Sequence, residues 1–292
     1  MASRRSSSGF FGWLIPRRFR SGPIVPVVRL SGVIGISTPL KPGLTLASVA
    51  RVLDRAFTFR RAKAIALVIN SPGGSAAQSH LIHARIRQLA VEHKLPVFAF
   101  VEDVGASGGY MIACAADEIV CDPSSILGSI GVVGSTFGFE KALKKLGIER
   151  RVYTAGKHKA MLDPFLPENP DDVKKLKAIQ SQIHDQFIAL VKARRGKKLK
   201  GPESALFSGE YWVGSKAVDL GLADQLGDIR AILRERFGAK VVTPLIAERG
   251  WFGRKIPGVG GARFESLLSQ SGLADEIVST LEARAIWARY GF

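Results

Sequence analysis

Short apolar runs alternate with helical patterns along the first half of the chain. Ala64–Ile69 and Val97–Val101 are apolar at every position, which is typical of strands buried on both faces of a parallel sheet. Residues 76–93 between them form a predicted helix, and Leu44–Phe57 carries an apolar stripe at helical spacing. The repeated order of strand, glycine turn and helix predicts an α/β fold.

The same patterns predict the remaining elements. We expect strands at Ile24–Leu30, Val33–Ile36, Glu118–Cys121, Arg151–Thr154 and Lys240–Leu245. Predicted helices are Phe137–Leu146, Asp171–Arg195 and Ile229–Phe237, with a small helical segment at Leu206–Leu226.

Three regions follow from these elements. Residues 1–22 form a basic segment, residues 23–246 form one domain of repeated strand–turn–helix units, and residues 247–292 form a glycine-rich linker and a C-terminal helical tail. The apolar spacing of the tail fits packing on the domain, contact with a partner subunit or contact with a membrane. The sequence does not choose among these three.

Positive charge dominates the composition, with a formal net charge of +17. It is concentrated in the N-terminal segment and in Lys192–Lys200, and such runs attract phosphates, anionic lipid or only water. No nucleic-acid partner is expected, because aromatic residues do not interleave with the basic ones. The sequence has no run of about 18 apolar residues that could span a bilayer as a helix. Pro16 and Arg17 end the first apolar run too early for a secretory signal.

Metal and disulfide chemistry find little support. Cys114 and Cys121 lie in apolar settings, which predicts two buried thiols in a reducing compartment. His80 and His83 share a helix face, but the histidines form no metal-ligand signature. We therefore expect neither a metal nor another cofactor.

The strongest candidate for chemistry is Ser107, in the turn Gly105-Ala106-Ser107-Gly108-Gly109 between a strand and a helix. Flanking glycines permit a sharp bend that can present a serine hydroxyl as a nucleophile, although a serine there can also simply cap the helix. A second glycine turn, residues 70–75, follows the preceding strand. Both turns belong at the carboxyl edge of the sheet, so the N–H groups near Gly74 and Gly108 could face one oxygen.

Four ordered motifs resemble the signal peptide peptidase (SppA) family of serine proteases. They are Asn70-Ser71-Pro72-Gly73-Gly74, Gly105-Ala106-Ser107-Gly108-Gly109-Tyr110, Gly128-Ser129-Ile130-Gly131-Val132 and Gly156-Lys157-His158-Lys159. The resemblance extends from about Val27 to Gly227. It implies a Clp-protease/crotonase-like α/β domain with a Ser–Lys catalytic pair, followed here by a C-terminal helical extension.

The resemblance also implies a role for each matched residue. Ser107 would be the nucleophile, Lys159 the general base, and Ser129 the hydroxyl that orients the lysine. Gly74 and Gly108 would supply the N–H groups of an oxyanion hole. A lysine accepts a proton from serine only when burial lowers its pKa from about 10.4 toward neutrality, so an apolar cleft is expected around it.

Two alternatives concern the base itself. Lys157 is a rival two residues away, and a Ser107–His158–Asp arrangement is a second possibility. The family motif places the base directly after an aromatic or histidine position, which favours Lys159. Ala160 stands where the family often has an acid, a departure that weakens the local match.

The resemblance implies a serine endopeptidase that acts on extended apolar peptides such as remnant signal peptides. The chain resembles short, single-repeat members that assemble into homo-oligomeric rings, with serine and lysine of one site from neighbouring subunits. Without the N-terminal membrane helix common in the family, we expect a cytoplasmic protein, with peripheral membrane contact left open. Two other classes are a crotonase-type acyl-CoA enzyme, for which Glu102 and Asp103 are the nearby carboxylates, and a non-catalytic scaffold.

Overall fold

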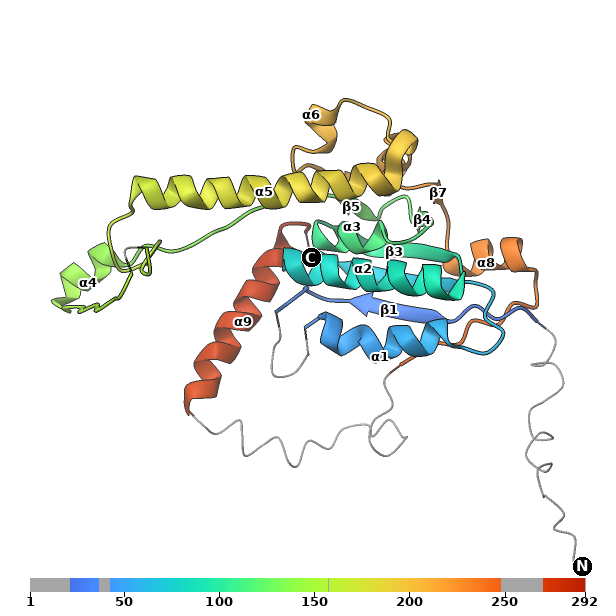
Figure 1. The fold of residues 1–292 in the computed structure, drawn as a ribbon, viewed down its shortest axis with the longest axis horizontal. Helices are drawn as coiled ribbons and strands as arrows, with labels where there is room; N and C mark the ends of the chain where they lie inside the picture. Colours follow the sequence, from blue (N-terminus) through green and yellow to red (C-terminus); the bar gives the residue numbers. More distant parts are fainter. Residues whose placement is uncertain (1–21, 37–42, 157, 248–269, 292) are drawn as a thin grey trace, which may run out of the picture.

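A mixed sheet forms the centre of the protein (Figure 1). The structure, a computed structural model, describes residues 22–36, 43–156, 158–247 and 270–291. Within them the order β1-β2-β3-β4-β7 is parallel throughout, β5 pairs in parallel with the last part of β3, and β6 is antiparallel to β5. The strands are β1 Val27–Ser31, β2 Ile65–Ser71, β3 Val97–Ala106, β4 Glu118–Cys121, β5 Ile126–Gly128, β6 Tyr211–Val213 and β7 Gln225–Leu226.

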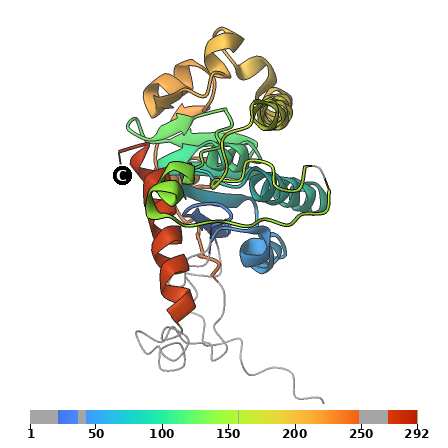
Figure 2. The ribbon, with the colours of Figure 1, turned by 90° about the vertical axis from the view of Figure 1, so that its left-hand side faces the viewer.

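Helices cover both faces of this sheet. They are α1 Leu46–Phe57, α2 Ala76–His93, α3 Gly108–Ala113, α4 Glu140–Leu146, α5 Pro170–Arg195, α6 Glu203–Leu206, α7 Gly214–Asp219, α8 Ile229–Phe237 and α9 Gln270–Ala288, with a 3₁₀ turn η2 at Gly196–Lys198. Figure 2 shows α5 end-on, with α9 running along one side of the molecule.

Alternate residues of the central strands enter two hydrophobic cores. Leu67 and Ile69 of β2 pack in the core that α1, α2 and α3 cover. Ala66 and Val68 face the other way and pack with Ile232 of α8. Both faces of the central strands are buried over residues 65–69 and 97–101, which agrees with the apolar runs in the sequence.

An arm projects from this body. We define it as residues 132–182, which comprise α4, the segments on either side of it and the first half of α5 (Figure 1). No described residue from 131 to 186 is buried. The arm is held by its own contacts, including the stacked rings of Phe139 and Phe165 at 5.5 Å and the guanidinium of Arg150 above the Phe165 ring at 4.8 Å.

The predicted α/β fold with repeated strand–turn–helix units is confirmed. β2, β3, β4, α2 and α5 lie where the sequence predicts them, and the C-terminal helical extension is α9. The predicted linker and nearly all of residues 1–22 lie outside the described residues. Both cysteines are buried and free, as expected.

Three predicted strands are wrong, and one predicted helical segment is only partly helical. Arg151–Thr154 forms no strand, because it lies on the arm with no sheet edge to pair with. Val33–Ile36 and Lys240–Leu245 contribute only isolated bridges, through Ile34, Val242 and Leu245. The predicted helical segment 206–226 instead contains β6, α7 and β7. Short strands of two or three residues give too little alternation to be recognised in a sequence.

Candidate active site

Two glycine turns meet at the carboxyl edge of the sheet. Ser71 at the end of β2 pairs with Gly105 near the end of β3, so the turns that follow leave the sheet side by side. A Cβ atom on Gly73 would lie 2.8 Å from the backbone nitrogen of Gly108 and 2.8 Å from Cβ of Ser107. Gly73 also has φ of +97°. Close approach and positive φ therefore both require glycine here.

Ser107 has a backbone conformation that favours glycine. Its φ is 51° and its ψ is −122°, and it stands between β3 and α3. The Ser107 N–H donates to the Gly128 carbonyl oxygen at 2.8 Å, and its own side chain caps no helix bond. A non-glycine residue held in this region costs on the order of 1–3 kcal/mol and commonly marks a functional position. The capping alternative for Ser107 is not observed.

Ser129 occupies the matching position on the neighbouring strand. Ala106 pairs with Gly128, so Ser107 and Ser129 each follow directly after one of two paired residues. Ser129 also has positive φ, 53°, and its N–H donates to the Glu210 carbonyl oxygen at 2.6 Å. The two half-buried serines are therefore neighbours on adjacent strand ends.

A cavity of about 1320 Å³ opens over these strand ends. It is lined by both serines and by Gly74 and Gly108, so four of the five predicted site residues share one space. Its other walls come from the body, the base of the arm and the end of α9. Apolar side chains there include Ile36, Met111, Val132, Phe137, Phe187 and Ile286.

The N–H groups of Gly74 and Gly108 are the predicted oxyanion donors. In the bridge between Ile34 and Gly74, the hydrogen bonds run from Ile34 to the Gly73 carbonyl and from Ser75 to the Ile34 carbonyl. Among the described residues, neither the Gly74 N–H nor the Gly108 N–H donates to a backbone carbonyl. Both glycines line the cavity, and neither N–H has a backbone acceptor among the described residues.

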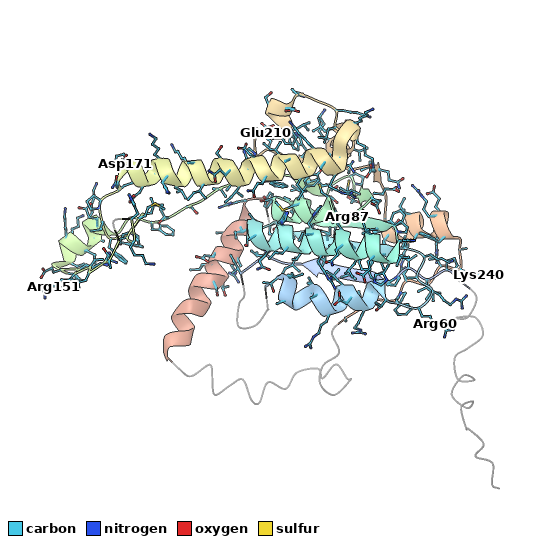
Figure 3. All side chains as sticks on the ribbon, in the orientation of Figure 1. Arg60, Arg87, Arg151, Asp171, Glu210 and Lys240 are labelled. Carbon is cyan, nitrogen blue, oxygen red and sulfur yellow. The ribbon has the colours of Figure 1, made fainter. Side chains whose placement is uncertain are left out.

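Lys159 is not in this cavity. It lies on the arm, its side chain is exposed, and its N–H donates to the Gly156 carbonyl oxygen at 3.1 Å. In the single chain the arm does not fold back over the body and the lysine is exposed, so its placement in an apolar cleft stays a prediction. Figure 3 shows Arg151 and Asp171 of the arm far out, whereas Glu210, whose carbonyl holds Ser129, lies over the body.

The two rival bases are no better placed. His158 is exposed and lines a separate hollow of the arm, about 910 Å³ in volume, together with Ala160. It does not line the cavity of Ser107, which removes support from a Ser107–His158–Asp arrangement. Lys157 lies outside the described residues.

One residue of the site could not be anticipated. Tyr290, just beyond the end of α9, is buried, and its hydroxyl donates to Oγ of Ser129 at 3.2 Å. Burial raises the pKa of Tyr290 above its usual value. The tail shows helical apolar spacing, but no sequence signal connects its last tyrosine to a serine so far away along the chain.

Buried groups behind the site make the turn of Ser107 rigid. Tyr110 of α3 is wholly buried and donates its hydroxyl to the Leu222 carbonyl oxygen at 2.8 Å. Arg195 pairs with Asp224 at 2.8 Å beneath the same helix. Burial raises the pKa of the Cys114 thiol to about 12, so this neighbour of the site is an inert thiol.

Comparison with known proteins identifies the family. The profile of peptidase family S49 matches residues 90–241, just over half of the chain. This chain belongs to peptidase family S49. The match contains Ser107, Gly108, Ser129 and Lys159, and it confirms the resemblance that the four motifs indicate. Gly74 lies before the matched residues.

Curated proteins that are similar to this chain match different shares of it. The Na(+)/H(+) antiporter NhaA of Brucella abortus (strain 2308) is 54% identical over 298 residues, which cover 99% of this chain and 40% of that protein. A putative protease of Methanocaldococcus jannaschii is 34% identical over 189 residues, covering 64% of this chain and 60% of that protein. The chloroplastic serine protease SPPA of Arabidopsis thaliana is 31% identical over 217 residues, which cover 71% of this chain and 31% of that protein. The chain thus spans less than two thirds of each relative's own length.

Solved structures give weaker similarity. A mutant of the 1510-N membrane-bound stomatin-specific protease, in complex with a substrate peptide, is 17% identical and aligns with a TM-score of 0.48. That alignment covers 89% of this chain and 99% of the other. Within the described part of this family S49 chain, no helix is both long and apolar enough to cross a membrane.

Proposed function

We propose that this chain is a serine endopeptidase that cleaves extended apolar peptides. The observation that carries the proposal is the pair of serines, Ser107 and Ser129, held at positive φ on adjacent strand ends in one largely apolar cavity. Membership of peptidase family S49 supports the reaction class. A metal or organic cofactor has no part in the proposed reaction.

In the first step, Oγ of Ser107 attacks the carbonyl carbon of the scissile peptide bond. Its proton passes to the neutral amine of Lys159, and the carbonyl oxygen becomes an oxyanion. The N–H groups of Gly74 and Gly108 would donate to that oxyanion, since neither donates to a backbone carbonyl in the described residues.

In the second step, the carbon–nitrogen bond breaks. The lysine returns the proton to the leaving amine, and the acyl group stays on Ser107 as an ester. A water molecule then attacks the ester while the same lysine accepts its proton. As the ester bond to Ser107 breaks, the lysine gives this proton to Oγ of Ser107, and the carboxylic acid product leaves. Ser129 would accept a hydrogen bond from the lysine in both steps and so orient the amine.

Lys159 would reach the site from a neighbouring copy in a homo-oligomer, with a ring as the expected arrangement. The lysine is exposed on the arm and absent from the cavity wall, so the isolated chain has a nucleophile without its base. The arm also exposes large apolar side chains that a neighbouring copy would bury, including Val133 (66%), Phe137 (77%), Leu146 (71%), Ile148 (54%) and Tyr153 (90%). Docking would move the amine from water into an apolar cavity, where its neutral form is favoured.

The cavity supports an apolar substrate in an extended conformation. Its wall includes Ile36, Met111 and Phe187, which offer no charge to a polar side chain. A folded protein could not bring its backbone to serines between two subunits, whereas an extended segment can. Remnant signal peptides satisfy these conditions. We place the reaction in the cytoplasm, with the basic N-terminal segment able to contact an anionic membrane surface.

An acyl-CoA enzyme of the crotonase type is less well supported. Such an enzyme would use the same N–H pair but needs a carboxylate base beside the second glycine turn. Glu102 instead pairs with Arg29, and Asp103 accepts a hydrogen bond from the Asn70 side chain at 2.6 Å. Neither carboxylate lines the cavity. Glu282 does line it, but from an exposed position on α9.

The test is hydrolysis of fluorogenic apolar peptides by wild type, Ser107→Ala, Lys159→Ala and an unfolded-then-refolded equal mixture of the two variants. We expect both single variants to be inactive. In the mixture, a site formed by two adjacent subunits has an intact serine and an intact lysine in about one quarter of cases, so about a quarter of wild-type activity should return.

Two control variants make the result specific. Lys157→Ala removes the rival lysine, and Ser124→Ala removes an exposed serine hydroxyl that does not line the cavity. Both should cleave like wild type. Retained cleavage by Ser107→Ala would refute the peptidase mechanism. Inactive single variants with no recovery on mixing would refute only the contribution of two subunits. A scaffold would tolerate every one of these changes.

A further inference from the structure

The end of α9 is anchored beside the catalytic serines by one buried residue. Tyr290 is only 9% exposed, whereas Leu281 on α9 is 59% exposed. The ring of Tyr290 packs with Val104 and Ala106 of β3 and meets the Tyr211 ring edge-on at 5.2 Å. The C-terminal segment therefore returns to the strand ends that carry Ser107 and Ser129.

Packing accounts for the ring but not for the hydroxyl. A phenylalanine would fill the same space against β3, yet the hydroxyl of Tyr290 lies 3.2 Å from Oγ of Ser129 and donates to it. The Ser129 backbone is fixed independently, through its N–H bond to Glu210 at 2.6 Å. The hydrogen bond from Tyr290 thus restrains the side chain of Ser129, which the backbone bond to Glu210 does not.

We propose that Tyr290 is a positioning residue of the active site, which holds the Ser129 hydroxyl in the orientation that receives the catalytic lysine. This inference rests on the proposed peptidase function. A serine oxygen has two acceptor sites and one proton. With the Tyr290 hydroxyl on one acceptor site, the other stays open to an N–H of the lysine amine, and rotation of the Ser129 side chain among its staggered positions is restricted.

A positioning role for Tyr290 predicts an effect on kcat and not on KM. The lysine must stand within hydrogen-bond reach of Ser107 when the serine proton leaves, and Ser129 sets that position through Tyr290. Loss of the Tyr290 hydroxyl should therefore lower kcat without raising KM. The ring remains in the Tyr290→Phe variant, so the cavity wall keeps its shape.

The test is a double-mutant cycle of Tyr290→Phe, Ser129→Ala and the double variant, assayed on a fluorogenic apolar peptide. We expect Tyr290→Phe to lower kcat roughly tenfold, the upper range for loss of one neutral hydrogen bond. In the Ser129→Ala background the same change should have almost no effect, because the hydroxyl would no longer have its partner. Thermal unfolding of each variant checks that the fold is intact.

Each outcome bears on the proposal differently. A tenfold loss that is equal in both backgrounds would show that Tyr290 acts through packing and not through Ser129, which overturns the inference. Wild-type or increased activity of Tyr290→Phe would also overturn it while leaving the peptidase mechanism intact, provided Ser107→Ala is inactive. If Ser107→Ala cleaves normally, the proposed function fails, and the role of Tyr290 fails with it.

Discussion

Replacing Gly73 with alanine tests whether the two glycine turns touch as the structure shows. The new Cβ would lie 2.8 Å from the backbone nitrogen of Gly108, and ordinary contact begins at 3.4 Å, so one backbone must yield by about 0.6 Å. The displaced atom carries a proposed oxyanion donor, and Ser107 lies next to it. A misplacement of about 1 Å can cost 10²-fold in rate, so kcat/KM should fall roughly tenfold to 10²-fold.

A second glycine separates the effect of the clash from the effect of the backbone conformation. Gly238, at the end of α8, has φ of +88°, close to the +97° of Gly73, but a Cβ there would have nothing within 4 Å. Gly238→Ala should cost about 1–2 kcal/mol for positive φ alone. Gly73→Ala should cost the same amount plus about 1–3 kcal/mol for overpacking.

Urea unfolding gives the free energy of unfolding of both variants, and hydrolysis of a fluorogenic peptide gives kcat/KM. We expect Gly238→Ala to keep wild-type kcat/KM despite its loss of stability. Equal losses of stability in the two variants, together with normal cleavage by Gly73→Ala, would refute the argument. Such a result would mean that residue 73 has room for a side chain and that the two turns are not in contact.

Two further predictions concern acid stability and assembly. Burial, and after it the positive charge of Arg194, lowers the pKa of His83 from 6.5 to about 4. The unfolded chain therefore binds a proton at His83 more readily than the folded chain does. The contribution of neutral His83 to the free energy of unfolding should be fully present above pH 6.5 and fall by roughly 3 kcal/mol as the pH drops to 4. Urea unfolding across that pH range measures this loss. The His83→Gln variant should not show it. Ile148→Asp on the arm should give monomers that do not cleave, as light scattering and peptide hydrolysis can show. Val91→Asp, which is 69% exposed on α2, should change neither property.

The buried half of the fold could be predicted because its physics is local. The runs that form β2, β3 and β4 are apolar enough to require two covered faces. Helix α2, between β2 and β3, is capped by Ser75, whose side chain accepts a hydrogen bond from the Gln78 N–H. The chain order of strand, turn and helix then places both glycine turns at one edge. Gly74, Ser107 and Gly108 share a cavity for this reason, and Ser129 joins them because β5 pairs with β3.

The rest depends on contacts that no local pattern records. Arg151–Thr154 has the composition of a strand, but a strand needs a partner, and the arm offers none. Tyr290 reaches Ser129 only because α9 returns to the sheet after a long excursion of the chain. The resemblance places Lys159 in a cleft shared by neighbouring subunits, and the single chain leaves this lysine exposed on the arm, because the contact would need a second copy.

Because Lys159 lies apart from Ser107, kinetics can distinguish a variant that weakens docking of the arm from a variant that removes the base. If the arm delivers the base to another copy, a variant that weakens docking will lose activity without touching any reacting atom. Its activity per chain should return at high protein concentration, because association is favoured by mass action. Lys159→Ala should stay inactive at every concentration, since its arm docks and still brings no amine. Thus a defect of Ile148→Asp that persists in the fully assembled state would contradict a purely docking role for the apolar surface of the arm.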